Sequence, residues 1–272
     1  MRASHIVHYL YLNGTTVKEE IIGVGAASIV VNRGGYAFKI PRIPMLLEID
    51  EQPVREKLSN PDDDEWNEVA VAITSLQHEK AIYKRLGDHP GIIRCYNVDS
   101  EEPSIQMPLM NGNLWQHLLE VRPERSRQLS WLLQLAHTMA FVHSRRVIIC
   151  DLRLDNIVYD DDMNIKLVDF SDSSRMDSQW DLKGCDKSGF SILSDIGRFG
   201  VVMFEIVTGQ HCSFDIYEDW HGVGPPTTWP RREKLPSTSE VWMGSIIEKC
   251  WTMGFASAQD LEGELEKEVP NI

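Results

Sequence analysis

Strand-like and helix-like patterns occupy different parts of this 272-residue chain. The first 40 residues carry short apolar runs, and the turn NRGG at residues 32–35 between two such runs is typical of a β-hairpin. From Trp66 on, apolar residues recur three and four positions apart, as on one face of a helix. Because strands and helices are largely segregated along the chain, the pattern predicts an α+β fold of two lobes with a cleft between them.

Individual elements can be predicted from the same periodicities. Strands are expected at HIVHYLYL (5–12), EEIIGVGAASIVVNRGGYAFKIP (19–41, with the hairpin), IIRCYNVD (92–99), SIQMPLM (104–110) and NIKLVDFSD (164–172). Helices are expected at 66–86, 113–121, 126–144 and 194–209, the last ending at Gly209. Ser237 and Glu240 have the spacing of a capping box and predict a further helix that starts there.

Composition and charge restrict the class of protein. An apolar fraction of 42% with 25% charged residues is typical of a globular domain. The net charge of −14 argues against binding to nucleic acid or to an anionic membrane surface. The five cysteines form no CxxC pair, and neither a signal peptide nor an apolar run of membrane-spanning length is present. We therefore expect a soluble intracellular, cytoplasmic protein with reduced thiols.

An acidic stretch separates the first strands from the first helix. Residues 42–68 contain nine acidic and three basic side chains. The composition favours a solvated loop, and an insertion that regulates the next helix or binds a partner is the alternative. We expect this stretch to lie within a first lobe, residues 1–109, which is followed by a second lobe, residues 110–272.

A glycine-containing loop joins two of the predicted strands. Gly23, Val24, Gly25 and Ser28 form the pattern GxGxxS. Because the loop joins strand to strand, it is not the dinucleotide-binding pattern that joins a strand to a helix. Glycines in such a loop let the backbone approach phosphate oxygens closely, although they also serve simple turns.

Two charged residues point to an ion pair in the first lobe. Lys39 stands on an apolar strand, where a lysine is costly unless it is paired or binds an anion. Glu79 on the following helix is its expected partner. The alternative is a lysine whose chain runs along the apolar surface and whose amine reaches water.

The stretch VIICDLRLDNIVYDDD contains the chain's most informative spacing. Asp151 can accept the proton of a hydroxyl nucleophile, while Asn156 can reach a magnesium ion. Asp169, thirteen residues beyond Asn156, can supply a second oxygen ligand. Taken singly, each acid can equally be a surface or capping residue.

In combination, these residues resemble the protein kinase family over nearly the whole chain. The matching stretches are GVGAAS with Val30, AFKI, HEKAIYKRL, FVHSRRVIICDLRLDN, IKLVDF and SDIGRFGVVMFEIVTG. The resemblance implies the bilobal kinase fold, with a small strand-rich lobe and a mainly helical lobe. It also implies ATP and Mg²⁺ as cofactors and a protein as the phosphoryl acceptor.

The resemblance assigns a role to each site residue. Gly23, Val24, Gly25 and Ser28 look like the loop that covers the phosphates, and Lys39 looks like the lysine that holds them, with Glu79 as its partner. Asp151 resembles the catalytic base, and Asn156 and Asp169 resemble the metal ligands. Arg153 stands where Ser/Thr-directed members carry a lysine near the γ-phosphate. The residues that resemble the adenine pocket are Val30, Ala37, Gln106, Met107, Leu109 and Val158, with Gln106 as gatekeeper and Met107 and Leu109 in the hinge. Asp195 resembles the helix acid that braces the catalytic loop.

Several positions depart from the family pattern. Ile149 and Cys150 replace the His-Arg pair before the base, and a thiol cannot pair with a phosphate as a guanidinium does. Ser171 replaces the glycine of Asp-Phe-Gly, which disfavours positive-φ conformations there. No Ala-Pro-Glu follows, and its arginine partner beyond Trp251 is also missing. Because Cys150 stands in place of the arginine, control through an arginine–phosphate pair on this segment is not expected.

Three functions remain open at this point. The first is ATP- and Mg²⁺-dependent phosphorylation of protein serine or threonine, with tyrosine as an alternative acceptor. The second is a pseudokinase scaffold that binds nucleotide or partners without turnover. The third is a small-molecule kinase, but IKLVDFSD is closer to the protein-kinase form than to the Ile-Asp-Trp form of those enzymes.

Overall fold

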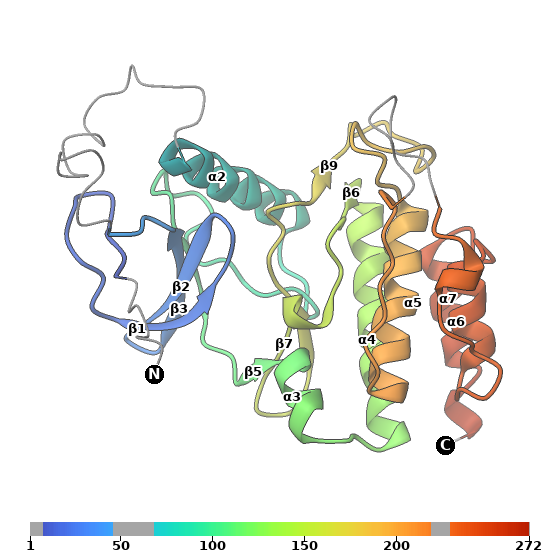
Figure 1. Cartoon of the computed structure of the whole chain (residues 1–272). Helices are drawn as coiled ribbons and strands as arrows, with labels where there is room; N and C mark the ends of the chain where they lie inside the picture. The colour runs from blue at the N-terminus through green and yellow to red at the C-terminus, as the bar shows by residue number, and fades with distance from the viewer. Residues whose placement is uncertain (1–7, 46–67, 219–228, 272) are drawn as a thin grey trace. The chain divides into compact units, whose positions relative to one another are not determined.

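The computed structural model of the chain describes residues 8–45, 68–218 and 229–271 (Figure 1). These residues group into two compact units. The first contains the described residues up to Lys84 together with Arg94–Leu109, and the second contains Arg85–Ile93 and the described residues from Met110 on. The sequence predicted lobes of residues 1–109 and 110–272, whereas residues 85–93 group with the second unit. Most of the acidic stretch, residues 46–67, lies outside the described residues.

A four-stranded antiparallel sheet forms the first unit. Its strands are β1 (Glu20–Val24), β2 (Ser28–Arg33), β3 (Tyr36–Pro41) and β4 (Ile105–Pro108), in the order β1-β2-β3-β4. The predicted hairpin joins β2 to β3 through Gly34 and Gly35, with φ of 59° and 82°. Two consecutive positive φ angles match the tightest hairpin turns, which glycine adopts without strain.

The register of the sheet separates two sets of side chains. Ile29 pairs with Ile40 and Val31 pairs with Phe38, and Val17 joins Ile29, Val31 and Ile40 in a buried apolar cluster. Directly opposed residues of antiparallel strands share a face. The alternate residues of β2 and β3, which include Lys39, therefore lie on the opposite face of the sheet.

Helix α2 (Glu68–Leu86) carries a stripe of buried residues. Ala72, Leu76, Glu79 and Tyr83 are buried at helical spacing, so a carboxylate lies within an otherwise apolar stripe. The helix ends before Gly87, whose φ of 68° favours glycine. The predicted helix and its end are confirmed for the described residues.

The second unit is mainly helical. Its helices are α3 (Leu114–Glu120), α4 (Arg125–Ser144), α5 (Ile192–Thr208), α6 (Gly244–Trp251) and α7 (Ala258–Glu266). Helix α4 packs on α5 and α7, and α5 packs on α6. Figure 1 shows α4 and α5 side by side. Gly209 ends α5 with a φ of 70°, as predicted. No helix among the described residues is long and apolar enough to cross a membrane.

Short strands and turns connect these helices. β5 (Gly112–Asn113), β7 (Ile157–Tyr159) and β8 (Ile165–Leu167) form one small antiparallel sheet, and β6 (Val147–Ile148) pairs with β9 (Ser174–Arg175). Single 3₁₀ turns occur at Leu154–Asn156, Arg232–Lys234 and Val269–Asn271. The α+β class predicted from the sequence is confirmed.

Two of the predicted strands were wrong. In residues 8–12, Leu10 forms only a bridge to Thr16, because the Asn13 side chain accepts a bond from the Thr15 N–H and turns the chain back. In residues 92–99, the chain turns from Tyr96 to Asp99 instead of extending. Side-chain bonds to the backbone compete with a strand ladder in both places.

The predicted capping box at Ser237 was also wrong. The Ser237 hydroxyl lies 3.1 Å from the Ser239 hydroxyl, and α6 begins only at Gly244. The Thr238 side chain instead donates to Glu248, 2.8 Å away, and residues 239–240 and 242–243 form turns. Helix α7, capped by Ser257, was not predicted.

Candidate functional site

Lys39 and Glu79 form a buried ion pair within the first unit. Lys39 Nζ lies 2.7 Å from Glu79 Oε2, and the two residues are 5% and 0% exposed. The lysine is therefore buried, and the alternative in which its amine reaches water does not hold. A charged pair at this depth keeps its charge only because each ion compensates the other. The structure thus brings together the two residues that the sequence pattern pairs.

The glycine loop connects β1 to β2 and is not explained by internal packing. A Cβ at Gly23 would meet Val30 at 3.5 Å, which is an ordinary contact, and a Cβ at Gly25 would lie 3.4 Å from Ser28 O. Neither glycine has a positive φ, and the neighbouring Val24 is 60% exposed. The missing side chains therefore leave open surface over the loop, which suits the close approach of a ligand.

Residues of the expected adenine pocket lie in both units. In the first, Val30 pairs with Lys39, and Ala37 lies two residues before Lys39, so these side chains share one face of the sheet. Gln106 pairs with Phe38 and therefore lies on the opposite face, whereas Met107 pairs with Ala37.

The expected hinge residues lie at the end of β4 and directly after it. Leu109 comes directly after β4 and is 39% exposed. Val158 belongs to β7 of the second unit. Of the residues in β4, Met107 lies on the sheet face of Lys39, whereas Gln106 lies on the other face.

Asp151 lies in the turn between β6 and β7, where a neighbouring amide orients it. Asn156 Nδ2 donates to the backbone oxygen of Asp151 at 3.0 Å and to its Oδ2 at 3.1 Å. Arg153 makes a two-bond ion pair with Asp155 and places Nη1 3.9 Å from Asp151 Oδ2. Burial raises the pKa of Asp151, and the nearby guanidinium groups oppose this rise.

A second arginine approaches the same carboxylate from helix α5. Arg198 Nη1 lies 3.9 Å from Asp151 Oδ1, and its guanidinium lies 5.8 Å from the centre of the Phe190 ring. The Asp151 carboxylate therefore lies close to one guanidinium at each oxygen. Sequence reasoning missed Arg198, since its only signal was a charged residue within the apolar pattern of α5.

Asp195 braces the backbone just before Asp151. Its carboxylate accepts the N–H groups of Ile149 and Cys150 at 2.8 and 2.9 Å, and His143 Nε2 lies 2.9 Å away. Asp195 is fully buried, and Cys150 has a φ of 64°, which is unfavourable for a non-glycine residue. The two bonds to Asp195 hold this strained turn in place, as the resemblance of Asp195 to the bracing acid implied.

Asn156 and Asp169 lie at the same end of the β7–β8 hairpin. Ile157 pairs with Leu167, and the Val168 N–H donates to Asn156 O at 3.0 Å, so Asp169 follows directly after the last paired residue. Asp169 has a φ of 61°, and the Ser171 hydroxyl donates to its Oδ1 at 2.7 Å. The serine that replaces glycine therefore binds the side chain of an expected metal ligand.

The donor set at this end of the hairpin fits magnesium. Asn156 uses its amide nitrogen in the bonds to Asp151, so its amide oxygen and the Asp169 carboxylate are the two hard oxygen donors that this hairpin end offers. Nowhere in the described ranges do three or more His, Cys, Asp or Glu residues gather as a metal cluster. One carboxylate and one amide are the kind of incomplete shell that Mg²⁺ completes with phosphate oxygens and water.

The segment between Asp169 and α5 is held by its own carboxylate. Asp186 accepts the Ser174 hydroxyl and the N–H groups of Ser188 and Phe190, the last two at 2.9 Å. Cys150 lies buried nearby, where burial and the charges of Asp195 and Asp186 raise the pKa of its thiol. The Asp186 carboxylate thus links residues 188 and 190 to Ser174 of β9.

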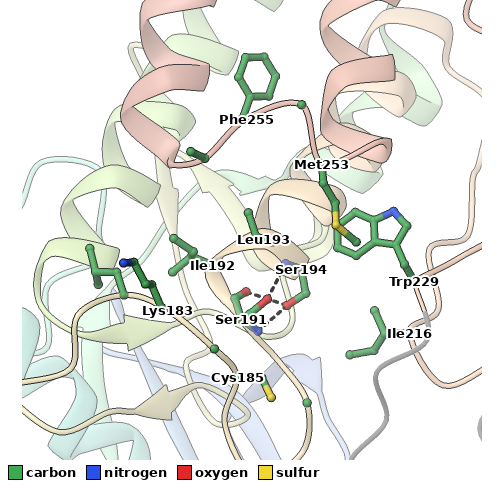
Figure 2. Close-up of a pocket in the computed structure, with 15 residues that line it drawn as sticks. Lys183, Cys185, Ser191, Ile192, Leu193, Ser194, Ile216, Trp229, Met253 and Phe255 are labelled. Carbon is green, nitrogen blue, oxygen red and sulfur yellow. Dashed lines mark hydrogen bonds between the residues drawn. The ribbon is translucent and has the colours of Figure 1, made fainter.

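A separate cavity lies beside the start of α5 in the second unit. Its volume is about 720 Å³, and it is lined by parts of residues 182–194 and 253–256 with Ile216 and Trp229 (Figure 2). Ser191 and Ser194 form the capping box that starts α5 at its wall, so the helix begins two residues earlier than predicted. The exposed Cys185 is also at this wall.

The chain matches the model of a known protein family. The family model described as the protein kinase domain matches residues 50–216, which is more than half of the chain. The chain belongs to the protein kinase domain family. This kinase domain has the α+β kinase fold that the resemblance predicted.

The names of the relatives include a serine/threonine-protein kinase and a tyrosine-protein kinase. Mitogen-activated protein kinase kinase kinase 11 of Homo sapiens is 26% identical over 290 residues, which cover 93% of this chain and 32% of the relative. Serine/threonine-protein kinase PDK1 of Cryptococcus neoformans is 30% identical over 147 residues, covering 45% of this chain and 12% of the relative. Tyrosine-protein kinase receptor svh-2 of Caenorhabditis elegans is 24% identical over 211 residues, covering 68% of this chain and 19% of the relative. The kinase domain spans about a third or less of the length of these curated relatives.

Proposed function

We propose that this kinase domain transfers the γ-phosphoryl group of ATP to a serine or threonine hydroxyl of a protein in a Mg²⁺-dependent reaction. The observation that carries the proposal is the Asp151 carboxylate, which the Asn156 amide orients and two guanidinium groups approach. A carboxylate oriented in this way can accept a proton from an attacking hydroxyl. Oriented groups of this kind are the main contribution of a protein to phosphoryl transfer.

Each side chain then has a defined task. Lys39, kept charged in its buried site by Glu79, binds the α- and β-phosphates, and the glycine loop covers them. Asn156 and Asp169 hold Mg²⁺, which neutralises charge on the phosphates when bound. Asp151 takes the hydroxyl proton while the hydroxyl oxygen bonds to the γ-phosphorus and ADP leaves. Arg153 stands where Ser/Thr-directed members of the family carry a lysine, and this resemblance supports serine or threonine as the acceptor.

The adenine ring is assigned to residues that resemble the family's adenine pocket. In the first unit, Val30 and Ala37 are assigned to its faces, and the Met107 carbonyl and the Leu109 N–H to its edge. The resemblance adds Val158 of β7 to this set. Gln106 is assigned the gatekeeper position. The support for this assignment is the shared sheet face of Val30, Ala37 and Lys39.

A pseudokinase scaffold is the second candidate function, and one contact favours it. The Ser171 hydroxyl and N–H both bind Asp169 Oδ1, at 2.7 and 3.3 Å. These bonds compete with a metal ion for the same carboxylate oxygen. A domain that loses metal affinity in this way would bind nucleotide or partners without turnover.

Phosphoryl transfer from radiolabelled ATP separates the two candidates. The full chain is incubated with Mg²⁺ and with casein or myelin basic protein as acceptors, and labelled residues are mapped. Turnover that Asp151→Asn abolishes supports the kinase, with phosphoserine or phosphothreonine as the expected product. Equal labelling by wild type and Asp151→Asn contradicts it, and a Mg²⁺-dependent rise in Tm with ATP but no turnover supports the scaffold.

A further inference from the structure

Lys80, the residue after Glu79, is a second buried lysine on α2. It is 5% exposed, and its Nζ donates to the backbone oxygens of Ser100 and Glu102 at 2.6 and 2.7 Å. Burial lowers the pKa of Lys80, while the neighbouring Glu102 and Glu101 carboxylates act in the opposite direction. A buried ammonium is retained only where hydrogen bonds satisfy it, so these two carbonyls are a specific binding site for the Lys80 side chain.

The loop that receives Lys80 is firmly attached to the sheet. The Tyr96 N–H donates to Gln106 O, and the Gln106 N–H donates to Asn97 Oδ1, both at 2.8 Å. Asn97 Nδ2 also donates to Ser104 O at 3.0 Å. These bonds connect the loop directly to β4, in which Ile105 pairs with Lys39 of β3. The acceptors of Lys80 and the partner of Glu79 therefore belong to one hydrogen-bonded framework.

Consecutive side chains on an α-helix point about 100° apart. Glu79 reaches β3, while Lys80 reaches the loop before β4, so α2 is attached to the same framework in two directions. A rotation of α2 about its axis would break at least one attachment. We propose that Lys80 is a positioning residue, which holds α2 in the rotation that pairs the Glu79 carboxylate with Lys39.

This role differs from that of Lys84, one helical turn further on. Lys84 Nζ lies 2.7 Å from Asp99 Oδ1 of the same loop, but the two side chains are 68% and 77% exposed. Exposed ion pairs contribute little because water screens them. Lys84→Met is therefore a matched control, since it removes an amine from the same helix face and the same loop without opening a buried site.

Hydrogen exchange measured by mass spectrometry tests the positioning role directly on the full chain. Lys80→Met is expected to speed exchange in residues 68–84 and 96–104 of the first unit, while the second unit keeps its wild-type exchange. Lys80→Arg, which retains the charge and the donors, is expected to exchange more slowly than Lys80→Met, and Lys84→Met to resemble wild type. Wild-type exchange in Lys80→Met, or an equal increase over both units, would overturn the proposal.

A second variant applies if Lys80→Met does not fold. Asn97→Ala loosens the loop that carries the acceptors and leaves the lysine in place. It is expected to speed exchange in residues 76–84 of α2. The hydrogen bonds of the Asn97 side chain go to Cys95, Ser104 and Gln106, so such an effect would pass through the loop. Unchanged exchange of α2 in Asn97→Ala counts against the proposal.

A thermodynamic cycle tests whether Lys80 acts through Glu79, and this arm rests on the proposed function. Lys80→Met is expected to weaken binding of Mg²⁺ and a non-hydrolysable ATP analogue about five- to tenfold, the lower end of the usual range of coupling between sites. In the Glu79→Gln background the same change should have no further effect. An undiminished effect there would overturn the positioning role, whereas absence of analogue binding by wild type contradicts the proposed function and leaves the exchange result to decide about Lys80.

Discussion

Arg198 Nη1 lies 3.9 Å from Asp151 Oδ1, although the two residues come from different elements of the second unit. Arg198 belongs to α5, whereas Asp151 follows β6. The Asn156 amide binds the other carboxylate oxygen, Oδ2, at 3.1 Å. The orientation of the proposed base therefore depends on a helix residue as well as on its own loop.

Replacing Arg198 should slow phosphoryl transfer. Arg198→Met removes the positive charge beside Oδ1, so the carboxylate is less firmly oriented toward the acceptor hydroxyl. We expect kcat to fall about tenfold, which corresponds to about 1.4 kcal/mol of barrier, with little change in the KM for ATP. Steady-state kinetics with Arg198→Lys as the charge-retaining control measure this, and a changed KM at constant kcat would contradict the orienting role.

Breaking the Lys39–Glu79 pair should destabilise the first unit. Lys39→Met leaves the Glu79 carboxylate buried without its cation, and loss of one partner of a buried pair costs about 3–5 kcal/mol. The double variant Lys39→Met/Glu79→Met removes both charges and should recover part of this loss. Urea unfolding of the single and double variants provides the measurement. A double variant less stable than both single variants would refute the expectation.

One thiol should react much faster than the other four. Cys185 is exposed, whereas Cys150, Cys212 and Cys250 are buried, and Cys95 is intermediate. Burial raises the pKa of Cys212 to about 11, so its reactive thiolate is scarce at neutral pH. The native chain should therefore release one rapid equivalent of thionitrobenzoate from Ellman's reagent, and the unfolded chain five.

The variant Cys185→Ser should lose the rapid phase and keep the slow ones. This control separates the exposed thiol from general opening of the chain. Two or more equally rapid thiols in the native protein would show that the buried sites are accessible.

The Arg232–Glu248 pair should stabilise the second unit in a pH-dependent manner. Arg232 holds the Glu248 carboxylate through two bonds of 2.7 Å, and this pairing lowers the pKa of Glu248 from 4.5. The stabilisation is complete above pH 4.5 and is lost as the pH falls through the lowered pKa, because protonation removes the negative charge. Since both side chains are about one-third exposed, we expect it to be only about 1 kcal/mol.

Thermal unfolding of Glu248→Gln and wild type between pH 3 and pH 7 checks this, where about 1 kcal/mol corresponds to a few degrees in Tm. The difference in Tm should be constant near neutral pH and should shrink below pH 4.5. The exposed Glu240→Gln is the control and should show no such difference. A difference that grows as the pH falls would contradict the prediction.

Local sequence signals predicted elements whose causes are local. The turn at Gly34 and Gly35 and the end of α5 at Gly209 both depend on positive φ angles that glycine adopts without strain. The predictions failed where side chains from elsewhere decided the outcome. Ser237 and Glu240 had capping spacing, but the Thr238 side chain binds Glu248 instead. Spacing alone contains no information about such partners.

The candidate site also contains residues that the sequence predicted and contacts that only the structure shows. Lys39, Glu79, Asp151, Asn156 and Asp169 were predicted as site residues because motifs preserve the order and spacing of residue types along the chain. Ser171 was noticed as a departure, but its bond to Asp169 required coordinates. Arg198 and Lys80 lie within matching stretches, but the resemblance assigned neither of them a role. Only the arrangement of helices brings them to the Asp151 carboxylate and to the loop at residues 100–102.

By itself, the sequence determined the family, the α+β class and the residue types available for chemistry, since these depend on periodicity and on ordered spacing. The tertiary structure decided which charged groups are buried and which atoms face one another. Burial and distance depend on how elements far apart in the chain pack, and that packing sets the free energy of each charge. The orientation of Asp151 and the two attachments of α2 are therefore properties of the fold.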